Sequence, residues 1–186
     1  MTKPEKDIEK IYRDRQFIKK LPRLADGLEI EIRPLRATDN LDDLIALSRA
    51  FFAEYAAHHP TFFQIDVLRD HNIVDYFTRW QEDEYGKTFI AVGDGRIVGN
   101  ITIYVQKQPV YWQVKQIGHI SGLMVAPAYR RRGIARALLR AAKSFFQQKG
   151  VRNFTVYTAV ANHPALQFCE KAGMVPLHTT LLGDLA

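Results

Sequence analysis

The sequence predicts a single α/β (α+β) domain, and three patterns support this fold class. A glycine turn at 93–95 joins two apolar segments, which is typical of an antiparallel hairpin. A strand at 117–125, a helix that begins at Ile134 and a strand at 151–159 follow one another as in a βαβ unit, whose strands are parallel. The chain has 186 residues, of which 47% are hydrophobic, and this suits one domain with a substantial core.

Residues 1–27 differ in composition from the main domain, which we place at 28–186. They carry eight lysine and arginine residues, interleaved at helical spacing with Ile8, Ile11, Tyr12 and Ile18. This pattern predicts a basic N-terminal helical extension that packs on the domain or on a second subunit. An arm that binds nucleic acid or a membrane surface is the alternative interpretation.

The main domain is predicted to begin with a strand and a helix. Leu28–Ile32 alternates between apolar and acidic residues, which indicates a half-buried strand, and Pro34 closes it. Apolar residues at helical spacing then predict a helix that runs to about Ala57. Thr38 or Asn40 is expected to cap its start.

A second helix is predicted over Asp66–Glu84, with Val67 among its inward residues. The strands 88–92 and 96–104 flank the glycine turn, and Gly99 indicates a bulge in the second of them.

A longer hairpin loop and a further strand follow. Residues 107–115 form the loop, in which Tyr111 and Trp112 are candidates to cover the mouth of the active site. Gly122 interrupts the strand at 117–125 and predicts a second bulge. Such a bulge frees backbone donors and acceptors, so an extended ligand that contains amides can pair with the strand.

The turn between this strand and the next helix is basic and contains glycine. Gly133 and Ala135 keep side chains away from the backbone, so the amides that start the helix can surround an anion. The helix dipole favours negative charge at the same place. Three guanidinium groups follow at four-residue steps, on Arg132, Arg136 and Arg140. The turn therefore suits a ligand with more than one phosphate, although it has neither the P-loop ending nor the glycines of a dinucleotide-binding turn.

The C-terminal part completes the βαβ unit and adds a short helix. Gly150 is the predicted C-cap of the crossover helix, and 151–159 is the parallel strand after it. Asn162 is expected to cap the short helix, which Gly173 ends. A final strand is predicted over 176–182.

Two of these segments resemble motifs of the GCN5-related N-acetyltransferase (GNAT) family. The turn stands as Arg130-x-x-Gly133-x-Ala135, which resembles the family's acyl-coenzyme A loop, Gln/Arg-x-x-Gly-x-Gly/Ala. The short helix is similar to the second motif, Asn-x-x-Ala-x-x-Leu/Phe-Tyr-Glu-Lys-x-Gly-Phe, at Asn162, Ala165, Phe168, Glu170, Lys171 and Gly173. Cys169 stands where the family usually has tyrosine, and Met174 where it has phenylalanine. The resemblance covers roughly residues 28–182.

The resemblance implies a mixed, mostly antiparallel sheet of about six to seven strands, with a central parallel βαβ unit and a V-shaped acetyl-CoA cleft. It also implies direct transfer of acetyl from acetyl-CoA to a primary amine. The coenzyme is expected to contact Leu123, Met124, Val125, Arg130, Arg131, Arg132, Gly133, Ile134, Ala135, Arg136 and Asn162. The two helices before the hairpin form an acceptor wall in this family, which makes substrate-side candidates of Tyr55, His58, His59, Phe62, Phe63 and Tyr76.

Such a transfer needs a base for the ammonium, a donor to the oxyanion and an acid for the thiolate. The backbone N–H of Leu123 is the candidate oxyanion donor. His119 is the candidate base, because the strand has no carboxylate where the family often places a glutamate. A structural histidine at this position, and acidic or histidine residues on the first two helices, are the alternatives. Cys169 is the candidate acid, with a small apolar residue as the alternative.

Composition narrows the class of partner. A single cysteine and the adjacent His58 and His59 have no metal-ligand spacing, so no metal is expected. A coenzyme with several phosphates accounts for the net charge of +6, so neither nucleic acid nor membrane is expected as a partner. The absence of a long apolar run or a signal core predicts a cytoplasmic protein. We expect a small-molecule or peptide amine as acceptor and consider a homodimer. The alternative function is a non-catalytic acyl-CoA-binding module of the same fold.

Overall fold

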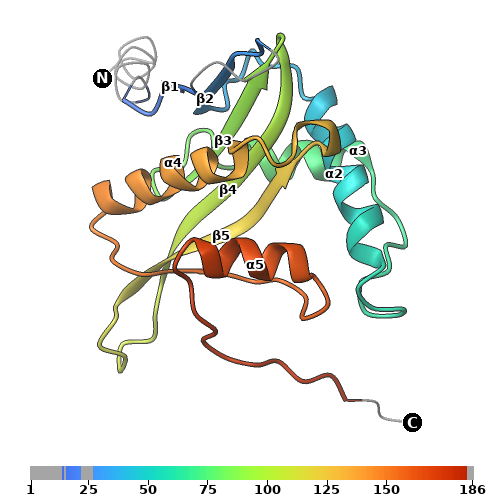
Figure 1. The fold of residues 1–186 in the computed structure, drawn as a ribbon. Coiled ribbons are helices and arrows are strands. Elements are labelled where there is room, and N and C mark those ends of the chain that lie inside the picture. The colour runs from blue at the N-terminus through green and yellow to red at the C-terminus, as the bar shows by residue number, and fades with distance from the viewer. Residues whose placement is uncertain (1–13, 15, 22–26, 184–186) are drawn as a thin grey trace.

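The computed structural model describes residues 14, 16–21 and 27–183, and Figure 1 shows a sheet flanked by helices. Within these residues, six strands lie in the order β1-β2-β3-β4-β5-β6. The first four neighbouring pairs are antiparallel, and β5 and β6 are parallel. The predicted mixed, mostly antiparallel sheet with a parallel βαβ unit is therefore confirmed.

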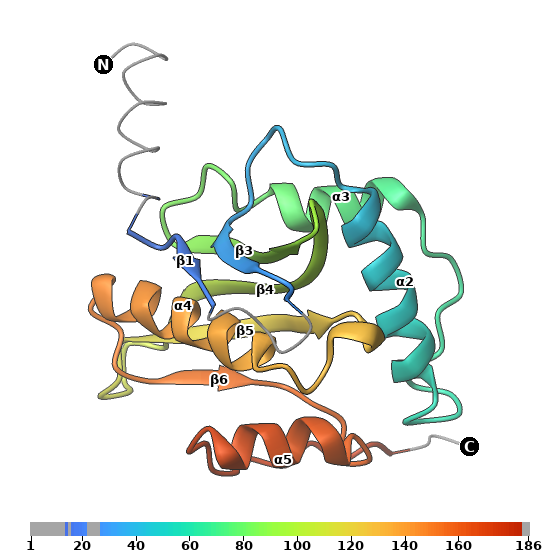
Figure 2. The ribbon, with the colours of Figure 1, turned by 45° about the horizontal axis from the view of Figure 1, so that its top comes forward.

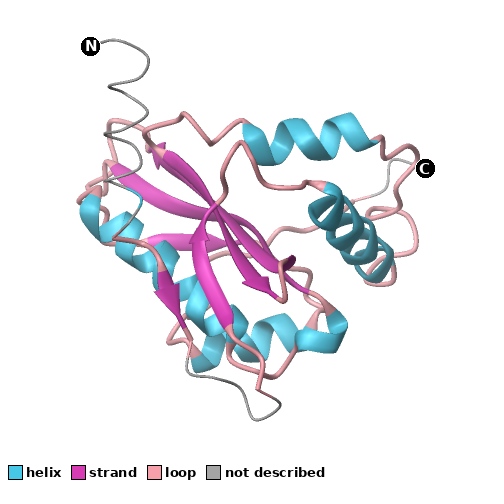
Figure 3. Ribbon diagram, turned by 90° about the horizontal axis from the view of Figure 1, so that it is seen from above, coloured by secondary structure: helices cyan, strands magenta, loops and turns pink. Residues whose placement is uncertain are grey.

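The described strands are β1 (Lys19–Lys20), β2 (Ile30–Pro34), β3 (Gly86–Gly93), β4 (Arg96–Lys107), β5 (Gln116–Val125) and β6 (Phe154–Val156). The helices are α2 (Asp42–Ala56), α3 (Asp70–Thr78), α4 (Ile134–Gln148) and α5 (His163–Lys171), with a short 3-10 helix at Pro127–Tyr129. Figures 2 and 3 show α2 and α3 on one face of the sheet, and α4 on the other. Helix α5 lies beside β6 (Figure 2).

Each face of the sheet has its own hydrophobic core. On one face, α4 buries a full helical stripe against the strands, at Ile134, Ala137, Leu138, Ala141, Ala142, Phe145 and Phe146. On the other face, α2 and α3 contribute Leu44, Leu47, Ile73 and Phe77, which pack with Ile90 of β3 and Met124 of β5. The sheet thus separates an α4 side from an α2–α3 side.

The predicted hairpin and its bulge are confirmed. Asp94 and Gly95 adopt φ values of 50° and 74°, as a two-residue turn between right-twisted strands requires. The register then shifts, because Ala91 pairs with Gly99 while Val92 pairs with Ile97. A Cβ on Gly99 would lie 2.9 Å from the carbonyl oxygen of Met124, so a close backbone approach accompanies the bulge.

A second bulge, also predicted, interrupts β5. Thr102 pairs with Gly122 and Ile103 with Ile120, so Ser121 is the extra residue. The parallel ladder between β5 and β6 ends at the same level, since its last pair is Ile120 with Val156. Beyond this pair the two strands part.

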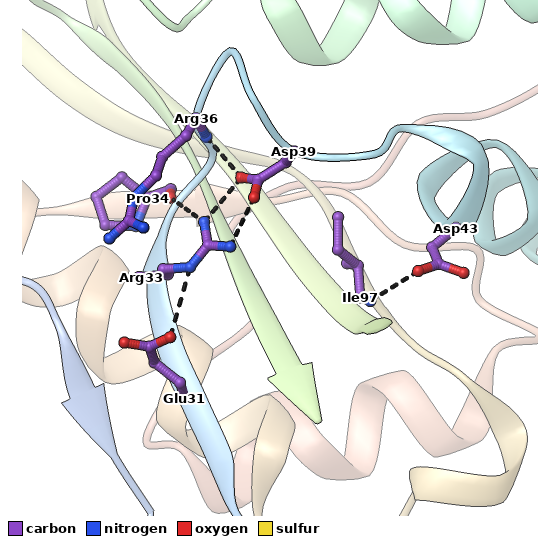
Figure 4. Close-up of polar contacts among 7 residues, drawn as sticks. All are labelled: Glu31, Arg33, Pro34, Arg36, Asp39, Asp43 and Ile97. Atoms are coloured by element: carbon purple, nitrogen blue, oxygen red, sulfur yellow. Dashed lines mark hydrogen bonds and ion pairs between the residues drawn. The ribbon is translucent and has the colours of Figure 1, made fainter. Parts of the chain in front are cut away.

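An internal ion pair shapes the connection from β2 to α2 (Figure 4). The Arg33 guanidinium donates to both carboxylate oxygens of Asp39, at 2.7 and 2.6 Å, and also to the carbonyl of Pro34. Asp39 also accepts from the amide of Arg36 at 2.7 Å. Burial alone would raise the pKa of Asp39, but these hydrogen bonds outweigh it and hold the pKa below its ordinary value.

Helix α2 is anchored to the sheet from its first turn. Asp43 accepts from the backbone amide of Ile97 at 2.9 Å and pairs with Arg96 (2.7 Å). Of the two candidate caps, Asn40 accepts from the amide of Asp42 at 2.9 Å, although Leu41 occupies the N-cap position.

The second helix is shorter than predicted. It runs over Asp70–Thr78 rather than 66–84, and Val67 is 62% exposed instead of inward. Trp80 has left the helix and stacks on Tyr104 of β4, with ring centres 5.1 Å apart. Trp80 thus packs on the sheet after the helix has ended, and helical periodicity in the sequence does not predict this contact.

The predicted final strand is wrong. Residues 174–183 form no strand in the structure, and Val175, Leu177, Leu181 and Leu182 are exposed. Apolar alternation indicates that a segment can pair, but pairing also requires a partner strand at the right register.

Of the predicted N-terminal helix, the structure describes Asp14 as helical, but residues 16–21 are not helical. Lys19–Lys20 pairs with β2 as an edge strand, and Phe17 is buried against Phe89 at a ring distance of 5.3 Å. The rest of the predicted extension, at residues 1–13, 15 and 22–26, lies outside the described residues.

Candidate active site

The turn before α4 has the backbone conformation of an anion site. Arg131 and Gly133 have φ values of 64° and 82°, and Gly133 is the N-cap of α4. A Cβ on Gly133 would meet nothing within 4 Å, so the space above the helix start is open. The amides of Ile134, Ala135 and Arg136 belong to the first turn and have no acceptor within the helix. The turn thus offers aligned N–H groups to a phosphate.

The arginines around this turn fall into two groups. Arg131, Arg132, Arg136 and Arg140 are exposed, and the Arg132 guanidinium lies 5.8 Å from the centre of the Tyr129 ring. Arg130 instead donates through Nε to the carbonyl of Val125 at 3.0 Å, and its terminal nitrogen pairs with Glu54 of α2 at 2.8 Å. The Arg130 side chain therefore links the turn to α2, while the other guanidinium groups surround the helix start.

Strand β5 carries backbone groups beside the gap that do not pair with β4, and of these the Val125 carbonyl accepts from Arg130. The amide of Ala126 donates to Val98 of β4 at 2.9 Å. Because peptide groups alternate along a strand, those of Leu123 and Val125 point away from β4, towards the side where β6 has parted from β5. The side chains of Leu123 and Val125 pack on the α4-side core, and Met124 packs on the α2–α3 side. The structure thus places the Leu123 N–H where an extended amide ligand can pair with β5.

His119 lies one residue before the point where β5 and β6 part. Gly118 faces α4, since a Cβ there would lie 2.6 Å from Phe146, so His119 faces the α2–α3 side. The imidazole is 7% exposed, and its Nδ1 lies 3.1 Å from the Thr155 hydroxyl of β6. Burial lowers the pKa of His119, so the ring is neutral at pH 7.

Two tyrosines flank this imidazole. The rings of Tyr104 and Tyr157 each lie 5.0 Å from it, and Tyr157 is 66% exposed. Sequence reasoning did not identify Thr155 or Tyr157 as site residues. Thr155 and Tyr157 are two residues apart, so strand alternation places their side chains on the same side. Only the parallel pairing of β6 with β5 brings these side chains to His119.

Tyr76 of α3 closes the opposite side of the bulge. Its hydroxyl lies 2.6 Å from the hydroxyl of Ser121, which is exposed. Burial raises the pKa of Tyr76, and hydrogen bonds with Ser121 and Thr102 oppose this only in part. Of the substrate-side candidates, Tyr76 is therefore a neutral hydroxyl directly beside the bulge.

The remaining substrate-side candidates form an aromatic cluster at the end of α2. The Tyr55 hydroxyl accepts from the amide of Ala159 at 3.0 Å, and the Tyr55 ring contacts His58 and Phe63 at 5.2 and 4.7 Å. His59 accepts through Nδ1 from the backbone amides of Thr61 and Phe62, so it organises the loop. Tyr111 and Trp112 are 79% and 57% exposed. Their loop joins β4 to β5 at the end of β5 opposite to the turn before α4 (Figure 1).

The second motif forms α5 as predicted. Asn162 caps the helix by accepting from the amide of Ala165 at 3.2 Å. None of the residues of α5 is buried, and Phe168 packs against the α4-side core. Cys169 is a half-buried free thiol whose pKa is raised by burial and by Glu170. It lies on α5 beside the α4-side core, whereas His119 faces the α2–α3 side.

No group of three or more His, Cys, Asp or Glu residues in the described part of the chain has the arrangement of a metal site. Within the same part, no helix is both long and apolar enough to cross a bilayer.

A sheet that opens between two parallel strands, beside an anion-binding helix start, defines a class of proteins that hold an extended phosphorylated ligand. The chain belongs to the acetyltransferase (GNAT) family, whose model matches residues 46–174. It is therefore an N-acetyltransferase that uses acetyl-CoA as co-substrate.

Individual relatives agree with this assignment. The N-alpha-acetyltransferase of Saccharolobus solfataricus is 28% identical over 153 residues, which cover 78% of this chain and 80% of that protein. The fold is similar to that of the BH1408 protein from Bacillus halodurans, with a TM-score of 0.71, 19% identity and coverage of 83% of this chain and 99% of that one. It is also similar to the aminoglycoside N-acetyltransferase AAC(6')-Iy in complex with CoA, with a TM-score of 0.69, 19% identity and coverage of 88% and 97%.

Proposed function

We propose that this chain acetylates the free α-amino group of a peptide or protein, with His119 as the base. The observation that carries the proposal is the neutral imidazole at the point where β5 and β6 part. The relative with N-alpha-acetyltransferase activity in its name matches over most of both chains. The aminoglycoside enzyme shares the fold at 19% identity, which supports no conclusion about the acceptor.

Acetyl-CoA would lie along the gap. The open helix start, with the amides of residues 134–136, suits the pyrophosphate, and the exposed Arg131, Arg132 and Arg136 suit the remaining phosphate charge. The Leu123 carbonyl and the Val125 N–H suit the amides of the pantetheine arm, which leaves the Leu123 N–H for the thioester carbonyl. Asn162 uses its carbonyl oxygen in the helix cap, so its amide nitrogen is the group left for the coenzyme. Arg130 would support the turn rather than bind phosphate, since Glu54 and Val125 hold its guanidinium.

The acceptor amine arrives as an ammonium ion and must lose a proton before it attacks the thioester. In the tautomer whose Nδ1–H donates a hydrogen bond to the Thr155 hydroxyl, Nε2 of His119 has a lone pair. This lone pair can accept the proton that the ammonium loses. The Leu123 amide would donate to the oxyanion that forms on the thioester carbonyl. Cys169 stays protonated at neutral pH, because burial raises the pKa of its thiol, and it remains our candidate donor to the departing thiolate.

The release of coenzyme A thiol with a free N-terminal peptide tests this proposal. His119→Ala should lower kcat by about 10²- to 10⁴-fold, with little change in acetyl-CoA affinity measured by calorimetry. Burial lowers the pKa of His119, so wild-type kcat/KM should stay high below pH 6.5 and fall only as pH drops through the lowered value.

Two controls complete this experiment. A peptide with a blocked N-terminus and a free lysine separates α-amino from side-chain acceptors. Wild-type turnover in His119→Ala would exclude the imidazole as base. Tight acetyl-CoA binding without thiol release on any amine would instead support the alternative, a non-catalytic acyl-CoA-binding module.

A further inference from the structure

The surface of β5 just beyond its bulge is walled by two side chains. A Cβ on Gly122 would lie 3.2 Å from the Tyr76 hydroxyl oxygen and 3.6 Å from the terminal methyl carbon of Met124. The neighbouring Ser121 is exposed, so the strand opens to solvent at the bulge and is closed one residue later. Tyr76 therefore lies over β5 beside the exposed Ser121.

Tyr76 is held in this place from both ends. Its helix, α3, is fastened to the sheet by Ile73 and Phe77, which are buried, and the Tyr76 ring packs edge-on against Phe77 at 5.0 Å. At its tip, the hydroxyl contacts Ser121 at 2.6 Å, and the Ser121 hydroxyl also donates to the carbonyl of Thr102 at 3.4 Å. A ring fixed at both ends acts as a rigid wall.

An acceptor reaches the His119 imidazole from the α2–α3 side, because the imidazole faces that side. On the α4 side, the side chains of Ile120, Leu123 and Val125 pack against the core. Ser121, which is exposed in the bulge, lies two residues after His119 on β5. An amine at the imidazole can therefore carry its substituent over Ser121 towards Tyr76, whose hydroxyl contacts Ser121 at 2.6 Å.

We propose that Tyr76, tethered by Ser121, limits the acceptor to α-amines with a small group on the amine-bearing carbon, such as peptides that begin with alanine or serine. The proposal rests on the function proposed above. A bulky first side chain would have to displace the Tyr76 ring and break its contact with Ser121. The two hydroxyl groups also offer a polar surface to a small first residue, since burial keeps the Tyr76 phenol protonated.

The test is a series of peptides that differ only in their first residue, assayed for kcat/KM. The wild type should favour alanine or serine over leucine or phenylalanine by about 10- to 100-fold. Tyr76→Ala should reduce this preference by about tenfold or more, because large first residues gain room. Tyr76→Phe keeps the ring and should retain most of the preference. Tyr76→Leu, which keeps apolar packing against Phe77 but shortens the side chain, should relax the preference as alanine does.

The matched control is Tyr85→Ala, since Tyr85 is 53% exposed and lies before β3, away from the bulge. It should leave the preference unchanged. Calorimetry with coenzyme A and thermal unfolding confirm that each variant is folded. A wild type that acetylates all peptides equally, or Tyr76→Ala and Tyr76→Leu variants that keep the full preference, would overturn the inference while the proposed function stands. If no peptide is acetylated, both the inference and the proposed function are wrong.

Discussion

Gly133 combines a backbone requirement with a ligand requirement in one residue. Its φ of 82° is in the left-handed region, where a Cβ is strained, and it caps α4. No atom lies within 4 Å of the Cβ position, so the space beside it is available to a ligand. Two substitutions of Gly133 can separate the effect of backbone strain from the effect of blocking the ligand.

Gly133→Ala should cost about 1–2 kcal/mol of stability through strain alone. Gly133→Glu should add a carboxylate in the anion site and abolish coenzyme A binding, with a similar loss of stability. Thermal unfolding measures the first effect and calorimetry the second. A folded glutamate variant with unchanged affinity would show that the pyrophosphate lies elsewhere.

At the scale of elements, the last turn of α2 contacts both sides of the gap. Glu54 pairs with Arg130 of the turn before α4, and Tyr55 accepts from Ala159 beyond β6. The side chains of Glu54 and Arg130 are 51% and 46% exposed, so their ion pair contributes little to stability. The ion pair joins the last turn of α2 to the turn before α4.

The arginines near the start of α4 should therefore differ in effect. Arg136→Ala and Arg140→Ala should each weaken coenzyme A binding by removing an exposed positive charge from the helix that follows the proposed phosphate site. Arg130→Ala should weaken it less and lower stability by no more than about 1 kcal/mol. Calorimetry with coenzyme A and dephospho-coenzyme A checks this order. A larger loss in Arg130→Ala than in the other two would mean that Arg130 leaves Glu54 to bind the ligand.

At the scale of the whole molecule, the α2–α3 layer is attached to the sheet through the connection after β2. Arg33 and Asp39 are both nearly buried, with side chains 10% and 11% exposed, and they form a bidentate pair. Asp43 adds a second attachment at Ile97 (Figure 4). Since this layer carries Tyr76 and the acceptor wall, its attachment also positions the site.

Asp39→Asn should lower the free energy of unfolding at pH 7 by about 3 kcal/mol, because it leaves the Arg33 charge buried without its partner. The pKa of Asp39 is depressed in the folded protein, so its contribution is present above the unfolded pKa of about 3.9 and is lost as pH falls through the lower folded value. Urea unfolding at several pH values checks both statements. Equal stability of the two proteins at pH 7 would show that the Arg33–Asp39 pair makes no net contribution to stability. Asp42→Asn, at the exposed first residue of α2, is the control.

The sequence by itself determined the features of the structure that depend only on residues close together in the chain. The hairpin at Asp94, the bulges near Gly99 and Gly122, the cap at Asn162 and the anion-binding turn at Gly133 were all predictable, because each follows from local backbone chemistry. The βαβ order and the two family motifs also stand in the sequence. These features were enough for the fold class, and the prediction of the coenzyme side of the site rests on them.

Only the tertiary structure decided which side chains meet. It joined Tyr76 to Ser121 and Thr155 to His119, directed Arg130 to Glu54, ended α3 before Trp80 and left residues 174–183 without a strand. Each of these outcomes depends on the register of strands and the packing of helices that are distant in sequence. Periodicity tells which face a residue is on, but it carries no information about what that face will contact.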